Sequence, residues 1–236
     1  MTTTAKIGRP FVTLALISLL VIAGAAQPAM AHSASLYIPW KWSTAGSNTI
    51  DWYFKSDFPG GAHRDRVLNG ASQWNQRGGA AEPNFINAGQ RTSPGNADNP
   101  CGNSLNGAFW RNLDLYGTSV LGVAIVCVDG FGNITRFTIN FDNNQNWYTG
   151  TGNASDGFLG LCIPSCEIDL WSVASHEWGH IAGFLRGPND DGHYDSGDPV
   201  CENNSSQHTM CPAYSPGTER MRTLAAHDIH TFEAAY

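Results

Sequence analysis

Two histidines four residues apart, on a segment with helical periodicity, constrain this chain more than any other feature. The H-E-x-x-H pattern at residues 176–180 lies within residues 168–184, where apolar side chains recur at helical spacing, namely Trp171, Ala174, Trp178 and Ile181. Residues four apart on a helix lie one above the other, with Cβ atoms about 5–6 Å apart. The imidazoles of His176 and His180 can therefore reach one tetrahedral metal ion.

Glu177 lies between these histidines and suits a general base that acts on a zinc-bound water. The motif alone also fits a helix with surface histidines, so the flanking residues decide. Gly183 follows His180 by three residues, where a left-handed residue would end the helix and let the chain turn back. This flank favours a metal site.

A second motif lies further along the chain, where Met210, Pro212 and Tyr214 form the pattern Met-x-Pro-x-Tyr. With this motif the chain resembles the metzincin metallopeptidases, and within them the matrixin group. The resemblance implies that Met210 forms the hydrophobic floor beneath the metal. It also implies that residues 212–214 line the pocket for the substrate side chain just after the scissile bond.

Other segments match the matrixin pattern in the same order, namely Trp74, residues 141–147 and residues 224–236. The fold implied is α+β, with a twisted mixed β-sheet, a long helix behind it, the zinc-binding helix, the Met-turn and a C-terminal helix. The family also implies that an extended polypeptide substrate binds along an edge strand, here about residues 134–141, by adding to the sheet.

The third zinc ligand departs from the family pattern, because Arg186 stands where matrixins have a histidine. Arginine stays protonated and cannot bind zinc. The following loop looks like an insertion, and we expect His193 within it to be the third ligand. A carboxylate from this loop is the alternative, as is a site with no third protein ligand. The candidate carboxylates are Asp190, Asp191 and Asp195.

The other family metals have weaker support in this sequence. Asn140 stands where matrixins carry a histidine for a structural zinc, so we predict no such zinc. Gln145 replaces an acidic calcium ligand while Asp142 is retained, which leaves a calcium site open. We expect one catalytic zinc, and we interpret Asp228 as structural. The remaining histidines are interpreted as non-ligands, namely His32, His63, His208, His227 and His230.

The first 31 residues have the pattern of a secretory signal peptide. Lys6 and Arg9 precede an apolar run over residues 11–26, and residues 29–31 read Ala-Met-Ala, a small-x-small cleavage pattern. No later stretch approaches the roughly 20 apolar residues of a membrane-spanning helix. We therefore expect residues 32–236 to form a single secreted catalytic domain.

Charge and cysteine content agree with an exported protein. Without the signal, eleven basic residues face twenty acidic ones, which argues against nucleic acid or anionic membranes as partners. We expect a monomer. Six cysteines in an oxidising compartment predict three disulfides, with fifteen connectivities open. A nearest-neighbour scheme joins Cys101 to Cys127, Cys162 to Cys166 and Cys201 to Cys211.

Periodicity predicts strands over residues 48–58 and 120–128, and helices over 64–76 and 223–235. A half-exposed strand is expected through Phe137, Ile139 and Phe141, where apolar residues alternate. Residues 88–107, 149–166 and 187–206 are rich in Gly, Asn and Ser and are interpreted as long loops.

The function expected from these features is a secreted zinc endopeptidase, with Glu177 as general base and His176, His180 and His193 as ligands. Two alternatives remain. One is a catalytically silent binding protein with the metzincin fold, and the other is a zinc amidase that acts on cell-wall peptides.

Overall fold

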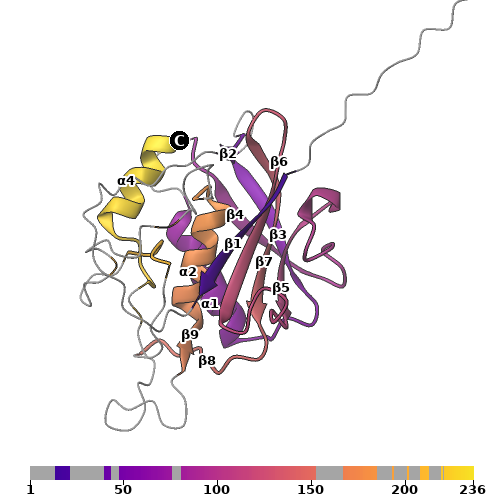
Figure 1. The fold of residues 1–236 in the computed structure, drawn as a ribbon, viewed down its shortest axis with the longest axis vertical. Coiled ribbons are helices and arrows are strands. Elements are labelled where there is room, and N and C mark those ends of the chain that lie inside the picture. The colour runs from indigo at the N-terminus through magenta and orange to yellow at the C-terminus, as the bar shows by residue number, and fades with distance from the viewer. Residues whose placement is uncertain are drawn as a thin grey trace, which may run out of the picture.

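The computed structural model describes residues 14–21, 40–43, 48–75, 81–152, 167–184, 193, 201, 208–212, 219 and 221–236. These residues form a mixed α+β fold, as predicted, in which helices cover a largely parallel sheet (Figure 1). Among the described residues, no helix has both the length and the apolar character needed to cross a membrane.

Seven strands form the main sheet, in the order β1-β6-β7-β5-β3-β4, with β2 also paired to β7. Strands β2, β3, β4, β5 and β7 run parallel to their neighbours within this group, whereas β6 is antiparallel to both β7 and β1. The bounds are Leu14–Val21 (β1), Lys41–Trp42 (β2), Thr49–Lys55 (β3), Asn84–Arg91 (β4), Asn106–Arg111 (β5), Val120–Val128 (β6) and Asn133–Asp142 (β7). Two short parallel strands, β8 (Trp147–Tyr148) and β9 (Ile168–Asp169), form a separate pair.

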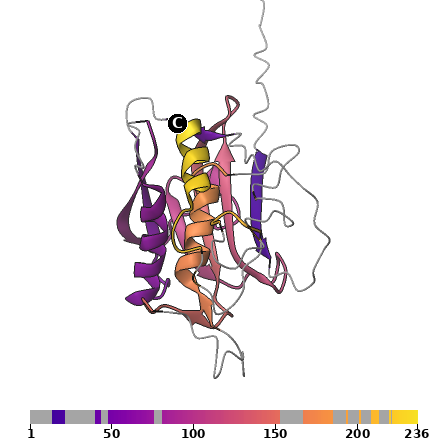
Figure 2. The same ribbon diagram turned by 90° about the vertical axis from the view of Figure 1, so that its left-hand side faces the viewer.

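Three α-helices are described: α1 (Ala62–Trp74), α2 (Leu170–Ile181) and α4 (Ala226–Ala235), with a short 3-10 helix, η1 (Pro100–Gly102). Figure 2 shows α1 and α2 side by side, with the sheet behind them. The two helices meet closely at Gly70 of α1, because a Cβ atom there would lie 2.8 Å from the backbone of Ala174 in α2. Helix α2 contacts β6 and β7 while α1 contacts β4, so the two helices cover the same face of the sheet.

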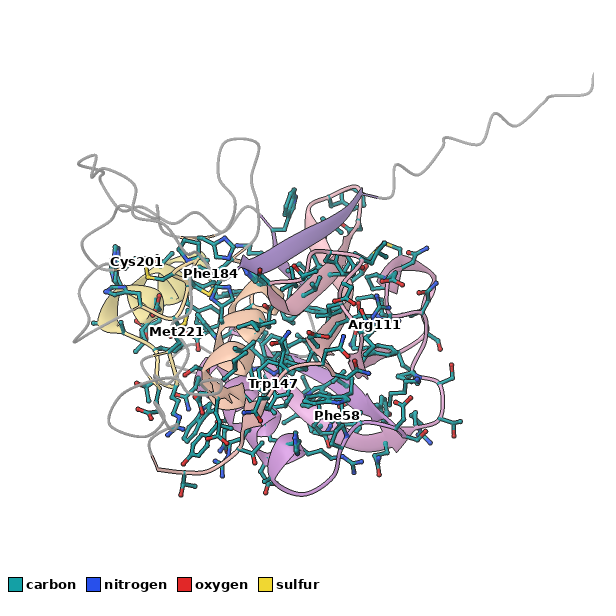
Figure 3. The ribbon with its side chains drawn as sticks, turned by 60° about the horizontal axis from the view of Figure 1, so that its bottom comes forward. Phe58, Arg111, Trp147, Phe184, Cys201 and Met221 are labelled. Carbon is teal, nitrogen blue, oxygen red and sulfur yellow. A yellow bond between two sulfur atoms is a disulfide. The ribbon has the colours of Figure 1, made fainter. Side chains whose placement is uncertain are left out.

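Aromatic side chains fill the layer between α2 and the sheet. Trp178 of α2 meets Trp52 and Phe137 of the sheet with ring centroids 4.9 and 5.3 Å apart. Two further indoles fix α2 through its backbone, since Trp74 Nε1 donates to Ser175 O and Trp42 Nε1 donates to Ile181 O. A second aromatic group, which includes Phe58 and Trp147, extends this core (Figure 3).

Most predicted elements are confirmed. The helices expected over residues 64–76, 168–184 and 223–235 are α1, α2 and α4, and the strands over 48–58 and 120–128 are β3 and β6. The long loop expected over residues 88–107 is wrong, because this stretch holds the end of β4, the helix η1 and the start of β5.

Two predictions about β7 are also wrong. The strand is not half exposed, because every residue from Phe137 to Asp142 is buried. The polar side chains between its apolar ones are buried because they find hydrogen-bond partners there: Thr138 Oγ1 and Asn140 Nδ2 both donate to Ala97 O. The prediction that residues 134–141 form an edge strand is also wrong, because β7 lies between β6 and β5. Strand β6 is the next strand outward, and only β1 lies beyond it.

The edge of β6 is covered by β1, whose residues lie within the expected signal peptide. Leu14 pairs with Val128, and the antiparallel ladder continues to Val21 opposite Val120. Residues 14–21 are thus extended and pair with the main-chain groups on the outer side of β6.

Two of the three expected disulfides are confirmed. Cys101 bonds to Cys127, which links η1 to β6, and Cys201 bonds to Cys211. The expected pair of Cys162 and Cys166 lies outside the described residues.

Candidate metal centre

The ends of α2 are defined by side chains that suit them. Asp169 caps the first turn by accepting a hydrogen bond from Ser172 N. At the other end Gly183 has φ 116°, as predicted, and the turn is closed by bonds from Gly183 N to His180 O and from Phe184 N to Gly179 O. The helix therefore ends at Ile181, one residue after the second histidine of the motif.

Three buried histidines meet beside this helix. His176 Nε2 lies 3.1 Å from His193 Nε2 and 3.2 Å from His180 Nε2. Three nitrogens bound to one zinc at tetrahedral angles lie about 3.3 Å apart, given Zn–N distances of about 2.0–2.1 Å. The spacing of these atoms therefore fits a single ion, and no other group of three or more metal-ligating side chains occurs among the residues described.

The outer nitrogens of two histidines set which form of the ring is present. His176 Nδ1 lies 2.7 Å from Thr209 O, and His180 Nδ1 contacts Phe184 O. A carbonyl oxygen only accepts hydrogen bonds, so each Nδ1 carries the proton and each Nε2 presents a lone pair. Two lone pairs that face each other repel unless a cation lies between them, so this arrangement suits a metal ion.

Burial also favours the neutral form of the His176 ring. Removal from water is the main cause that holds the pKa of His176 well below its ordinary value of 6.5, and the nearby charge of His193 adds to it. The backbone oxygen of Thr209 acts in the opposite direction. A neutral imidazole is the form that binds metal ions, so His176 is ready to bind without losing a proton.

Glu177 lies in the same buried layer but has a different environment. Its side chain is fully buried, and neither carboxyl oxygen has a hydrogen-bond partner in the described part of the chain. Burial raises the pKa of this carboxyl well above 4.5, and the backbone N–H of Ala124 lowers it. That N–H is near enough to act on the charge, although it makes no hydrogen bond of ordinary geometry.

The turn that contains Met210 packs against α2. Met210 is fully buried, and a Cβ atom on Gly179 would lie 2.2 Å from Met210 Sδ, so only glycine allows this close packing. Met210 therefore packs against the residue that precedes His180. The disulfide of Cys211 to Cys201 anchors the next residue, while Met221 and Phe184 lie in the same part of the molecule (Figure 3).

Asp228 links this turn to the last helix, as its interpretation as a structural residue predicts. Its Oδ2 accepts hydrogen bonds from Thr209 N and from Ala225 N, at the start of α4. Thr209, whose carbonyl oxygen orients His176, is thus linked to α4 through its N–H group.

Asn140 and Asp142 both hydrogen-bond to nearby protein groups. Asn140 Nδ2 also donates to Val123 O. The carboxylate of Asp142 accepts from Leu113 N, Asn144 N and Gln145 Nε2.

Some predicted residues cannot be compared. Pro212 is described beside Met210, but Arg186, Asp190, Asp191, Asp195, Tyr214 and His32 lie outside the described residues. The histidines expected to be non-ligands, namely His63, His208, His227 and His230, are not members of the three-histidine group.

Three parts of the site were missed by sequence reasoning. The backbone oxygens of Thr209 and Phe184 orient the histidines, and no side-chain pattern signals them. Gly122 of β6 contacts Glu177, and it does have a signal, since a lone glycine inside an apolar strand marks a close approach.

Comparison with known proteins adds no relatives, because no family model matches this chain and no curated protein is significantly similar to it.

Proposed function

We propose that this protein is a secreted zinc endopeptidase of the metzincin type, in which Glu177 is the general base. One observation carries the proposal. Glu177, a buried carboxyl group with no hydrogen-bond partner among the described residues, lies on the same helix as two imidazoles whose Nε2 atoms can bind a metal ion. An unpaired buried carboxyl costs stability, and a purely structural metal site gains nothing from it.

The histidines are suited to zinc by their number, softness and spacing. When held by His176, His180 and His193, zinc supplies Lewis acidity, which polarises a carbonyl group and acidifies a water molecule. Thr209 O and Phe184 O keep the first two rings oriented with Nε2 toward the ion.

Glu177 handles the proton in the proposed reaction. Its carboxylate takes a proton from the attacking water and returns it to the leaving amine, so the peptide bond is hydrolysed without a covalent enzyme intermediate. In the part of the chain that the structure describes, no hydrogen bond occupies either carboxyl oxygen, which supports this role.

The substrate proposed is an extended polypeptide that pairs with the edge of β6. Support comes from β1, an extended segment that already pairs antiparallel with this strand over Leu14–Val21. Strand β6 also holds Gly122, which contacts Glu177, so a chain bound along this edge passes close to the catalytic carboxylate.

Secretion is supported by the signal-like residues 1–31 and by two disulfides. Metzincin identity is supported by the packing of Met210 against Gly179, the residue before His180, and by the α+β arrangement.

The test compares the chain from His32 with three variants, using cleavage of an unfolded protein and bound zinc as readouts. We expect chelator-sensitive cleavage by the parent. Glu177→Gln should keep zinc and lose at least about 100-fold in kcat. His193→Ala should lose zinc and activity together. His230→Ala, on the exposed face of α4, is the control and should keep both.

A parent chain that binds zinc but cleaves no protein would overturn the proposal in favour of a silent binding protein. Cleavage of cell-wall peptides alone would instead identify an amidase.

A further inference from the structure

Gly122 is the point where the sheet meets the catalytic carboxyl. It lies in β6, is paired with Phe141 of β7, and faces α2. A Cβ atom at this position would lie 2.7 Å from Glu177 Cγ, 2.7 Å from Oε1 and 2.9 Å from Cδ. Since Cβ contacts below 3.0 Å essentially never occur, the side chain of Glu177 occupies the space that any other residue would fill.

Glu177 has little else to hold it in place. Its carboxyl oxygens have no hydrogen-bond partner of ordinary geometry among the described residues, and the backbone N–H of Ala124 is near enough only to act on the charge. The side chain is fully buried, so the atoms packed around it limit where it can lie. Its position is therefore set by the shape of the surface that it packs against, and Gly122 forms the hollow in that surface.

The contact is specific to Glu177. All three of the nearest atoms to the added Cβ belong to this residue, and none belongs to a histidine of the metal site. Gly130 at the end of the same hairpin offers a contrast, since a Cβ there meets nothing within 4 Å. A methyl group at residue 122 would thus displace the carboxylate and leave the three imidazoles in place.

We propose that Gly122 is a positioning residue, which holds the Glu177 carboxylate at the distance from the metal and the β6 edge that proton transfer requires. The steric contact stands by itself, whereas its catalytic consequence rests on the proposed function. Displacement of a catalytic group by about 1 Å can cost on the order of 100-fold in rate.

The contact is tested first by a thermal double-mutant cycle in metal-free protein. Gly122→Ala should lower Tm by about 5 °C, because overpacking a buried contact is destabilising. In a Glu177→Ala background the same change should lower Tm by no more than about 1 °C, because that variant lacks Cγ, Cδ and both carboxyl oxygens. Gly130→Ala is the matched control and should show no coupling to Glu177→Ala.

Equal losses in Tm in both backgrounds would overturn the proposal, because the methyl group would then meet something other than Glu177. If Gly122→Ala alone fails to fold, recovery of folded protein on addition of Glu177→Ala supports the contact. Failure of the double variant as well overturns it.

The catalytic consequence is tested in the zinc-loaded protein. Gly122→Ala should keep one zinc per chain and a KM within about threefold of the parent, while kcat falls about 100-fold. An unchanged kcat would overturn the positioning role. Thermal coupling in a parent chain that cleaves no peptide would support the contact and overturn the proposed function, so the two failures are distinguishable.

Discussion

His176 and His180 are oriented by backbone oxygens, not by side chains. Thr209 O and Phe184 O each face an Nδ1 atom, so the orientation of both rings depends on the local fold of the Met-turn and of the end of α2. No single side-chain substitution removes these acceptors. We therefore expect the orientation of both rings to tolerate substitutions of the side chains at residues 184 and 209, but to change when the backbone at these residues moves.

Glu177 should make the metal-free protein less stable as pH rises. The raised pKa of its buried carboxyl means that the unfolded chain loses this proton above about pH 4.5 while the folded chain retains it. Stability associated with the protonated form is then lost progressively above that pH. Glu177→Gln removes the titration, so the variant's gain in free energy of unfolding over the parent should be small at pH 4 and largest near pH 8, where we expect roughly 1–3 kcal/mol. Thermal unfolding in chelator across this range checks it, and a pH-independent difference would contradict it.

Sequence reasoning selected His176, His180 and the proposed base Glu177 because one helix holds all three residues. His193 could be selected only as one alternative among several, since a ligand from a loop has no period that ties it to the helix. Gly122 was missed because its role appears only when β6 packs against α2. Gly122 and Glu177 are more than fifty residues apart, so no local sequence pattern predicts their contact.

At the scale of elements, α2 is held at both ends. Asp169 caps its start and also receives Arg222, whose Nη2 lies 2.7 Å from Asp169 Oδ1. The guanidinium also donates to Thr151 O and Gly152 O. Arg222 therefore connects the segment before α4 both to residues 151–152 and to the start of α2.

Loss of this ion pair should destabilise the fold. Arg222→Met leaves the carboxylate of Asp169 fully buried without its charged partner, which typically costs about 3 kcal/mol. The exposed pair of Lys55 and Asp57 is the control, because Lys55→Met should cost less than about 1 kcal/mol. Urea unfolding of both variants measures the difference, and equal small losses would show that Asp169 is satisfied without Arg222.

Gly183 should matter for metal binding as well as for stability. Its φ of 116° is strained for any other residue, so Gly183→Ala should cost about 1–2 kcal/mol. The strain falls between His180 and the Phe184 oxygen that orients it, so zinc affinity should fall by about tenfold. Gly60→Ala, where a Cβ meets nothing within 4 Å, is the control. Chelator competition compares the two, and an unchanged affinity in Gly183→Ala would separate the turn from the metal site.

The strands were harder to predict than the helices for a physical reason. Strand β6 is a continuous apolar run and was predicted with its bounds, whereas β4 and β5 contain Asn and Gly, residues that are typical of loops. Alternation along β7 indicated a half-exposed strand, but Thr138 and Asn140 find backbone partners inside the fold. Strand order also depends on pairing between distant segments, which periodicity along one strand does not encode.

At the scale of the whole molecule, the candidate site lies where several separate segments converge. Helix α2 supplies His176, His180 and the proposed base Glu177, His193 completes the group that could hold a metal ion, and Gly122 of β6 contacts Glu177. The Met-turn is fixed from the other side by Asp228 and by the disulfide of Cys201 to Cys211. The sheet edge beyond β6 is the side on which β1 lies, clearly separated from α1 and α4 in Figure 2.

The leader should therefore inhibit the proposed peptidase while it remains attached. Because β1 uses the main-chain groups of β6 along Leu14–Val21, a polypeptide substrate must displace it before it can pair beside Gly122. We expect kcat/KM for an unfolded protein to be about tenfold lower in the chain with residues 1–31 than in the chain from His32, mainly through KM. A full-length chain with Leu16→Pro and Ser18→Pro is the control, because proline cannot donate to a ladder, and it should regain most of the activity. Equal activity of all three chains would show that substrate binds elsewhere than at the edge of β6.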